Sequence, residues 1–429
     1  MIEEKDEVME NLHKLLRGSI EEGEFEAALA CLDTMIRFTP YDSKPHIMRS
    51  EVLTQLERFD EAITSIQTAL SLSPSSSRAL GVAANCYLSV GDVLSAKMAI
   101  DRSLTIAPEQ PRMKWQRSFC SLSMFDFKSG FEEYEYGFCA SSRTPRGPLN
   151  KRWNGEPTPV LFVHGEQGLG DQIQFIRFLE EAKARSGGML VLETQAELIG
   201  LCKHCADLVV AMQPDGSIPV AYTKWISLLS IPNILGVDKV FGNAYFTPPE
   251  VEVDLAGAKV GFVYSGNPKY PNDKGRSLTL EEARQFEGFA PFGLLQNAGE
   301  IPFEMPRIAG ADIGHTAAVI SKLDLVVTVD TSIVHLCGAL GKEAWLIAPK
   351  NGEWRWGLSG SKSPWYDSVE VFRCVDQDRQ PAIKAICDRL KARYGKSDFL
   401  PANIKRPLAK AIEEAPETQQ QEEPEMQAA

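Results

Sequence analysis

The chain has 429 residues, a length typical of about two or three domains. Its formal net charge of −13 argues against binding to nucleic acid or anionic lipid through a broad electrostatic surface. Hydrophobic residues make up 44% and aromatic residues 9%, which excludes collagen, mucin and disorder of the whole chain. Six glutamates and no Lys or Arg follow Ile412, so the rest of the chain is only mildly acidic.

The sequence shows no targeting signal that we recognise. The first ten residues lack the basic and apolar regions of a signal peptide. The longest uncharged and mostly apolar run, residues 225–237, contains Pro232 and is too short to span a bilayer. Nine cysteines, an odd number scattered along the chain, fit reduced thiols better than a disulfide framework. These features predict a cytoplasmic protein without a membrane span.

An internal period of 34 residues runs through the N-terminal third. Prolines recur at this spacing at Pro40, Pro74 and Pro108. A column of small residues keeps the same step at Ala28, Ala62 and Ala96. Small residues where helices touch, apolar columns behind them and a proline that stops each helix predict helix pairs. The pattern resembles the tetratricopeptide repeat, and residues 1–140 contain three clear units and a degenerate fourth.

The fourth unit is degenerate but in phase, because Phe127 follows Val93 by 34 residues and Gly130 occupies the alanine column. One interpretation is that its aromatic residues form a core or a capping repeat, since terminal repeats are atypical. The other is that the array binds a partner peptide. A short solenoid could also serve mainly to brace the next domain.

After a linker predicted at residues 141–159, the pattern changes from helix pairs to alternating strands and helices. In residues 160–250 we expect a strand at 160–164, a glycine loop at 165–170 and a helix at 171–184. Further strands are expected at 189–193 and 208–212. The sequence therefore predicts a first α/β lobe.

A second α/β lobe is predicted at residues 257–397. Strands are expected at 260–264, 292–296, 325–329, 344–348 and 369–373, and helices at 316–323, 332–340 and 382–393. Thr279 and Glu282 form a capping box for another helix. Alternation of this kind predicts parallel sheets with ligands at the carboxyl ends of the strands. The acidic tail at 401–429 is rich in Pro, Gln and Glu and is predicted to be disordered.

The strongest candidate site lies in residues 326–341, where a strand is followed at once by a helix. The strand delivers Asp330, Thr331 and Ser332 to its carboxyl end, and His335 falls on the first helical turn. Backbone N–H groups and hydroxyls at a helix start can bind an anion such as a diphosphate. The alternative is that Thr331 or Ser332 is only an N-cap and His335 a packed core histidine.

Asp171 follows the glycine loop of the first lobe, at the start of the next helix. Glu166, Gly168 and Gly170 lie in this acceptor-side loop. Asp171 is a candidate general base that takes a proton from an acceptor hydroxyl. It could instead be a helix-capping carboxylate, whose charged form is favoured there and which would be a weak base. His164 and Glu166 are reserve candidates.

Two further loops belong to the candidate site. The loop after residue 264 offers Ser265, Asn267, Lys269 and Arg276, and a cation there could offset the charge of a leaving diphosphate. Such loop residues are otherwise simply solvated. Aromatic residues cluster at 354–356 and 365–366, where packing of the loop explains them better than stacking on a base.

Other motifs carry little weight. Cys202 and Cys205 form a C-K-H-C sequence, but no second cysteine pair lies at zinc-finger spacing. We find no P-loop, no H-E-x-x-H and no G-x-S-x-G. The glycine loop also lacks the dinucleotide-binding spacing. No metal or cofactor is expected.

Five motifs in family order resemble bacterial tetratricopeptide-repeat proteins fused to a heptosyltransferase-like glycosyltransferase domain of the GT-B kind. They are RWNGE at 152–156, GEQGLGDQIQF at 165–175, the segment 260–278, LDLVVTVDTSIVHLCGALG at 323–341, and EWRW with SPWY at 353–366. The resemblance implies an α/β GT-B-like fold of two Rossmann lobes, with the acceptor facing the first and a nucleotide-sugar donor on the second. It also implies metal-independent transfer, with Asp171 as the base and Asp330, Thr331 and His335 at the donor diphosphate.

Two departures from the family pattern stand out: His315 replaces an expected Asp, and the loop after Pro349 is polar. The first hypothesis is a glycosyltransferase that moves a sugar from a nucleotide-sugar donor to a hydroxyl of a protein or glycan, with the acceptor docked on the repeats. The alternative is a repeat scaffold with a degenerate, non-catalytic GT-B domain. A nucleic-acid-modifying transferase is disfavoured by the acidic balance. The sequence names neither the sugar, the nucleotide base, the acceptor nor the oligomeric state.

Overall fold

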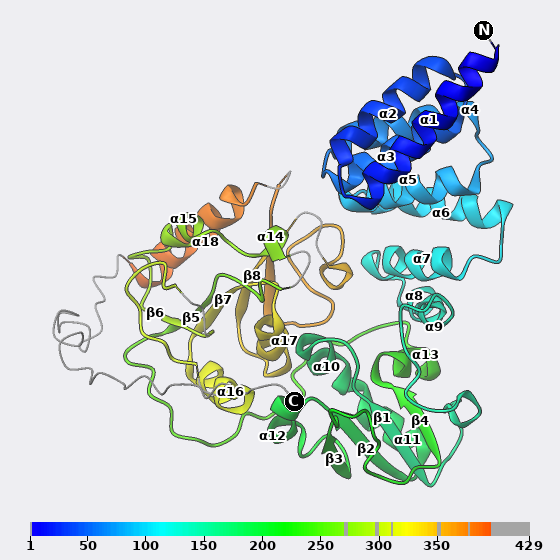
Figure 1. Ribbon diagram of the computed structural model, residues 1–429. Helices are drawn as coiled ribbons and strands as arrows, with labels where there is room; N and C mark the ends of the chain where they lie inside the picture. Colours follow the sequence, from blue (N-terminus) through cyan, green and yellow to red (C-terminus); the bar gives the residue numbers. More distant parts are fainter. Residues whose placement is uncertain are drawn as a thin grey trace, which may run out of the picture.

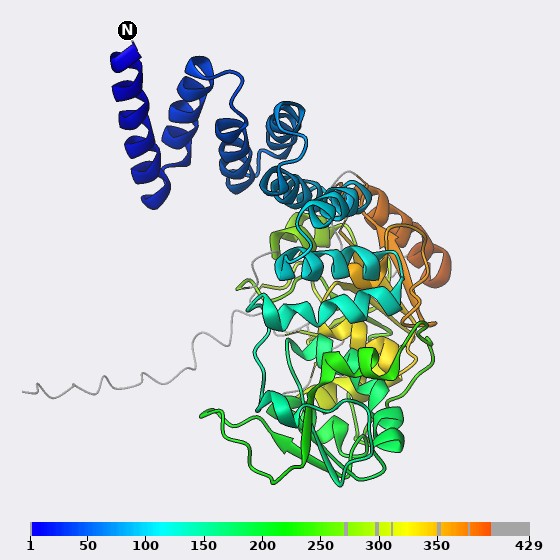
Figure 2. The same cartoon turned by 90° about the vertical axis from the view of Figure 1, so that its right-hand side faces the viewer.

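The computed structural model describes residues 2–269, 273–296, 300–309, 312–349, 353–375 and 378–395. An array of helices stands beside two α/β units, each built around its own sheet (Figure 1). Seen from the side, the array steps down onto the α/β units through its last helices (Figure 2). The predicted disordered tail lies outside the described residues.

The N-terminal array consists of helix pairs in a regular step. Its helices are α1 (Ile2–Glu21), α2 (Phe25–Phe38), α3 (Ser43–Gln55), α4 (Phe59–Leu72), α5 (Ser77–Ser89), α6 (Val93–Ile106), α7 (Pro111–Ser123), α8 (Phe127–Tyr134) and α9 (Tyr136–Cys139). The alanine column is fully buried where paired helices touch. Asp92 and Asp126, 34 residues apart, both cap a helix by accepting a backbone N–H. The period seen in the sequence is therefore a structural period, and α7 and α8 continue it.

The fourth helix pair belongs to two cores at once. Phe127 and Phe131 on α8 pack into the same apolar cluster as the α/β units. The ring of Phe131 lies 6.0 Å from that of Phe175, and the ring of Phe127 lies 5.3 Å from that of Trp365. The residues that depart most from the repeat pattern are thus the ones that attach the array to the rest of the protein.

The first α/β unit has a parallel four-stranded sheet in the order β3-β2-β1-β4. Its strands are β1 (Val160–His164), β2 (Met189–Thr194), β3 (Leu208–Ala211) and β4 (Lys224–Ser227). Its helical segments are η1 (Leu149–Lys151), α10 (Leu169–Phe175), η2 (Ile176–Phe178), α11 (Leu179–Ser186), η3 (Ala196–Leu198), α12 (Ile199–Cys202), η4 (Leu228–Ser230) and α13 (Ile231–Leu235). The short strand β4 is an element that the sequence pattern did not predict.

The prediction of one helix at 171–184 is wrong in two respects. It begins earlier, at Leu169, because Asp171 is not the cap but accepts the N–H of the capping residue Gly168 at 2.9 Å. It is also interrupted by the 3-10 turn η2, where the Arg177 guanidinium donates back to the carbonyl of Gln174 at 3.0 Å. Gly187 then ends α11 with a left-handed φ of 66°.

The second α/β unit has a parallel five-stranded sheet in the order β6-β5-β7-β8-β9. Its strands are β5 (Val260–Val263), β6 (Phe292–Leu294), β7 (Leu325–Val329), β8 (Ala344–Ala348) and β9 (Val369–Arg373). Its helical segments are α14 (Asp273–Arg276), α15 (Leu280–Arg284), α16 (Ile313–Lys322), α17 (Ser332–Ala339), η5 (Trp354–Trp356) and α18 (Gln380–Tyr394). The predicted capping box is confirmed: Thr279 and Glu282 exchange side-chain and backbone hydrogen bonds.

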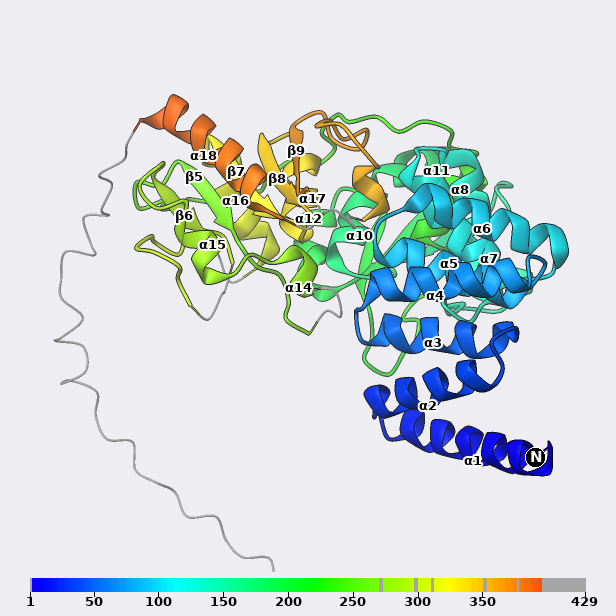
Figure 3. The ribbon, with the colours of Figure 1, turned by 90° about the horizontal axis from the view of Figure 1, so that it is seen from above.

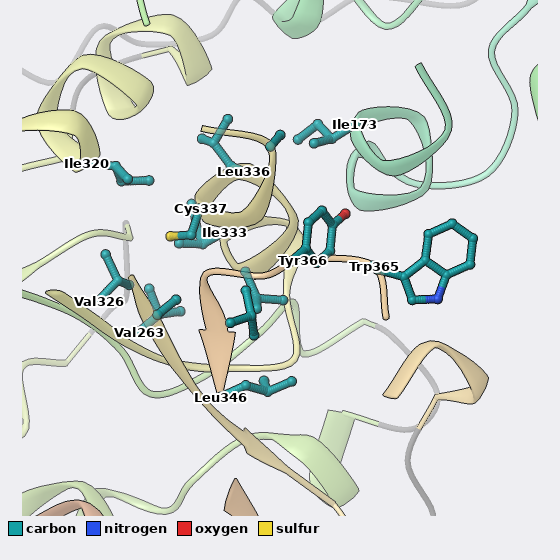
Figure 4. Packing of buried hydrophobic residues seen from close by; sticks show 14 of the residues in the cluster. Ile173, Val263, Ile320, Val326, Ile333, Leu336, Cys337, Leu346, Trp365 and Tyr366 are labelled. Atoms are coloured by element: carbon teal, nitrogen blue, oxygen red, sulfur yellow. The ribbon is translucent and has the colours of Figure 1, made fainter. Parts of the chain in front are cut away.

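Helix α17 forms the centre of the packing between the two sheets. Leu336, Cys337 and Ile333 on α17 pack among residues of β5, β7 and β8, and Ile173 of α10 points toward the same helix (Figure 4). All nine cysteines lie in the described residues and none is bridged. Within the part of the chain that the structure describes, no helix is long and apolar enough to cross a membrane.

Candidate active site

The order of the strands marks where each unit can bind a ligand. In the first sheet, β1 has β2 on one side and the later strand β4 on the other, so the connections leave in opposite directions. The second sheet has the same reversal between β5 and β7. Crevices at such points, beyond the carboxyl ends of the strands, are the usual ligand sites of α/β sheets. The loops at 164–171, 265–276 and 330–335 all begin at these two points.

The start of α17 has the N-cap that the sequence offered as one interpretation. Thr331 is the N-cap, and its hydroxyl accepts the N–H of Ile333 at 3.3 Å. Thr331 and Ser332 stay partly exposed. Asp330 is only 7% exposed. Burial raises the pKa of Asp330 to about 7; the charge of Glu353 adds to the rise, and Arg355 and Arg276 oppose it.

His335 is a packed residue of the core rather than an open one. It is 5% exposed, its Nδ1 lies 2.9 Å from the Tyr366 hydroxyl, and its ring stacks on Trp356 at 5.4 Å. A Cβ added to Gly170 would meet the His335 Cδ2 at 2.9 Å, so α10 approaches the ring closely. Burial, followed by the charges of Arg355 and Arg177, holds the pKa of His335 well below its usual range. The ring is neutral at physiological pH.

Arg276 connects the loop after β5 to the end of β7. Its Nη1 donates to the backbone carbonyl of Asp330 at 3.0 Å, and its Nε pairs with Asp273 at 3.0 Å. Ser265 accepts a hydrogen bond from the Gln296 amide at 2.9 Å. Asn267 is exposed and caps the N–H of Lys269. The structure thus brings Arg276 and Asp330 together, whereas Asn267 lies out in solvent.

Asp171 is held by one contact from each α/β unit. One carboxylate oxygen accepts the Gly168 N–H at 2.9 Å, and the other forms an ion pair with the Arg355 guanidinium from η5. The side chain is 24% exposed, so the carboxylate can still be reached. The turn before it places Gln167 at a left-handed φ of 64°, a conformation that costs about 1–2 kcal/mol for a non-glycine residue.

The other residues of the glycine loop have structural partners. Glu166 pairs with Arg143, whose side chain is fully buried and also donates to the Ser230 hydroxyl at 2.8 Å. His164 Nδ1 lies 2.7 Å from the buried carboxylate of Glu193. Since Arg143 comes from the segment predicted as a linker, that segment is part of the first unit's packing and does more than connect two domains.

Sequence reasoning missed Arg355 as a site residue. It was grouped with the aromatic residues of its loop, which indeed pack, since Trp354, Trp356, Trp365 and Tyr366 are all buried. The signal that could have found it is a charged residue between two tryptophans, because a buried guanidinium needs an acidic partner. Among the described residues, no group of three or more His, Cys, Asp or Glu is arranged to hold a metal ion.

Comparisons with known proteins cover one repeat of the helical array and, at low identity, most of the chain. Residues 44–76 match the tetratricopeptide repeat. The chain is 23% identical over 415 residues to Protein FlbA of Caulobacter vibrioides, covering 75% of this chain and 68% of FlbA. MamA of Desulfovibrio magneticus RS-1 is 15% identical, with 32% of this chain and 78% of MamA covered and a TM-score of 0.29.

The second TPR domain of human RPAP3, solved in complex with an HSP70 peptide, is 18% identical, with 27% of this chain and 98% of that domain covered and a TM-score of 0.26. The match at residues 44–76 and the observed helix pairs give the protein an N-terminal helical-repeat solenoid of the tetratricopeptide type, followed by parallel-sheet α/β structure.

Proposed function

We propose that this chain is a glycosyltransferase that moves a sugar from a nucleotide-sugar donor to a hydroxyl of a protein or glycan acceptor. The two α/β units would then be the two lobes of a GT-B-type fold. The observation that carries the proposal is the meeting of the two crevice loops. A Cβ added to Gly170 of the first unit would lie 3.4 Å from the Ser332 Cα of the second. Candidate base and candidate anion site thus face each other.

The donor diphosphate would bind at the start of α17. The positive end of the helix favours an anion there, and Thr331 and Ser332 add hydroxyl donors. Arg276, fixed on the carbonyl of Asp330, supplies a positive charge beside this helix end. Charge that develops on the leaving diphosphate would be stabilised by these fixed groups. The raised pKa of Asp330, about 7, would reduce the negative charge beside the diphosphate near neutral pH.

The acceptor hydroxyl would give its proton to Asp171, whose partly exposed carboxylate is fixed in orientation by its two partners. His335, neutral and held by Tyr366, would support the loop from below rather than bind the phosphates. Tetratricopeptide-type repeats commonly serve as platforms for other proteins, so a protein acceptor docked on the array is part of the proposal.

A non-catalytic scaffold is the second candidate, and one observation favours it. Asp171 is already paired with Arg355, and Asp330 and His335 are both buried. In that case the α/β units would serve only to anchor the repeats. The two candidates differ in a single measurable property, which is turnover of a nucleotide sugar.

The test begins with thermal unfolding of the full chain in the presence of UDP-, ADP-, GDP- and CDP-sugars. A ligand at 100 times its Kd stabilises the folded state by about 2.7 kcal/mol. We expect one nucleotide class to raise the melting temperature. Thr331→Val should abolish that rise, whereas Thr105→Val, at an exposed site on α6, should leave it intact.

Release of the nucleoside diphosphate from the stabilising donor is then measured with candidate acceptors and with water. Asp171→Asn should slow release at least a hundredfold while the thermal shift persists, because general-base catalysis contributes about 10²–10⁴ in rate. Binding without any release would support the scaffold. Absence of binding at millimolar donor would refute the transferase proposal.

A further inference from the structure

Arg355 connects parts of the molecule that lie far apart in the sequence. It stands 184 residues from Asp171 and 181 from Gln174, yet its Nη2 pairs with Asp171 and its Nε donates to the Gln174 amide oxygen at 2.6 Å. Its Nη1 donates to Glu353 at 2.7 Å, and its guanidinium lies 4.4 Å from the centre of the Trp354 ring. Every nitrogen of this buried side chain therefore has a partner.

The partners of Arg355 lie in both α/β units. Asp171 and Gln174 belong to α10 of the first unit, and Glu353 belongs to the second. A planar guanidinium donates from separate nitrogens in a fixed fork, whereas the three N–H donors of a lysine ammonium all belong to one nitrogen. The pKa of Arg355 is raised: burial acts to lower it, but the charges of Asp171, Glu353 and Asp330 outweigh burial.

The fourth repeat supports the turn that carries Arg355. Helix α7 packs against η5, and a Cβ added to Gly357 would overlap the Phe125 ring at the end of α7. Trp354 also stacks edge-on against Trp365 at 5.7 Å and against Phe175 at 6.4 Å. In the view from above, the first repeats stand away from the α/β units, and the array meets those units through its later helices (Figure 3).

From this geometry we infer that Arg355 is the positioning residue of the candidate active site: it reaches across the boundary between the two α/β units and fixes the carboxylate of Asp171. The inference rests on the proposed function. Gly168 binds one oxygen of Asp171, and Arg355 binds the other. The carboxylate therefore keeps its orientation only while the two units stay in contact. Loss of Arg355 leaves Asp171 in place but free to turn.

A kinetic double-mutant cycle tests this role. Release of nucleoside diphosphate at saturating donor is compared for the wild type, Arg355→Gln, Asp171→Asn and the double variant. A misplaced catalytic group can cost about a hundredfold in rate. We expect Arg355→Gln to lower kcat tenfold to a hundredfold with the donor KM within threefold. Because Arg355 acts through Asp171, it should have less than a twofold effect in the Asp171→Asn background.

Two further variants separate positioning from loss of structure. Arg373→Gln removes an arginine that holds the same loop through the carbonyls of Gly357 and Gly360 and does not touch Asp171. We expect its kcat to remain within threefold of the wild type. Arg355→Lys keeps the charge and should recover less than a third of the lost rate, since one nitrogen does not replace the two separate nitrogens that bind Asp171 and Gln174.

The outcomes are distinct from those for the proposed function. An equal loss from Arg355→Gln in both backgrounds, or an equal loss in Arg373→Gln, would overturn the positioning role while leaving the transferase intact. Wild-type protein that binds nucleotide sugars but releases nothing would refute the proposed function itself. Melting temperatures of all variants are recorded in parallel, so that a variant that fails to fold is recognised and Arg355→Lys decides in its place.

Discussion

The buried carboxyl of Asp330 makes the stability of this protein depend on pH in a direction that can be worked out. Burial raises its pKa from 3.8 to about 7. Between these values the folded chain keeps a proton that the unfolded chain has released. Stability falls with pH wherever the native state binds more protons, so this contribution is complete below about pH 4 and is lost as pH rises through 7.

The size of the effect follows from the same values. A rise from 3.8 to about 7 corresponds to roughly 4 kcal/mol in total, at about 1.4 kcal/mol for each pKa unit. Roughly 1 kcal/mol of this is lost between pH 6 and pH 8, because the folded carboxyl releases its proton over that interval while the unfolded one is already ionised. Asp330→Asn keeps the shape of the side chain but cannot titrate.

The assay is urea unfolding of wild type and Asp330→Asn at pH 6 and pH 8, followed by circular dichroism and tryptophan fluorescence so that two-state behaviour is checked. The free energy of unfolding of the wild type should fall by roughly 1 kcal/mol more than that of the variant. Asp388→Asn, on the exposed face of α18, should keep the wild-type dependence. Parallel curves for wild type and Asp330→Asn would show that Asp330 is charged in the folded state and would refute the reasoning.

Two predictions concern packing. Phe131→Ala should lower the free energy of unfolding by about 3–5 kcal/mol, because it empties a buried site between α8 and α10. Phe241→Ala, at a 74% exposed ring, should change it by no more than about 1 kcal/mol. Denaturant unfolding compares the two variants, and equal losses would contradict the shared core. Gly338→Ala should destabilise the folded protein by about 1–3 kcal/mol, because the new methyl group overlaps the Tyr366 ring. Gly200→Ala in α12 has open space around the new methyl group and should stabilise the folded protein by up to about 1 kcal/mol. Melting temperatures measure both, and a stabilising Gly338→Ala would show that Tyr366 can move away.

The features that could be predicted from the sequence are those that a short segment determines by itself. The strand at 325–329 and the start of the helix at 332 were predicted at their observed positions, because four buried apolar residues and a capping threonine all lie within a few positions. The capping box at Thr279 is equally local. The 34-residue period is a repetition within the sequence and needs no knowledge of distant contacts.

The features that were missed depend on partners far along the chain. Strand β4 has only four residues, and its place is set by pairing with β1 and by the packing of Trp225 on Phe162. The segment at 141–159 looked like a linker from its Pro and Gly content, but Trp153 is 2% exposed. The partnership of Arg355 with Asp171 spans 184 residues, a distance at which a single sequence carries no pairing information.

The packed rings of Phe127, Phe131, Phe175 and Trp365 have a consequence for how this protein could be divided or recombined. A cut at residue 140 would leave the rings of α8 on one fragment and their partners on the other, so both fragments would carry freshly exposed aromatic surface and a tendency to aggregate. A shortened chain that begins at Pro111 keeps these rings together, although it uncovers Met113 and Cys120 of α7, which pack in the core of the array. The first three repeats can therefore be replaced or extended as one unit, whereas the fourth must stay together with the α/β units.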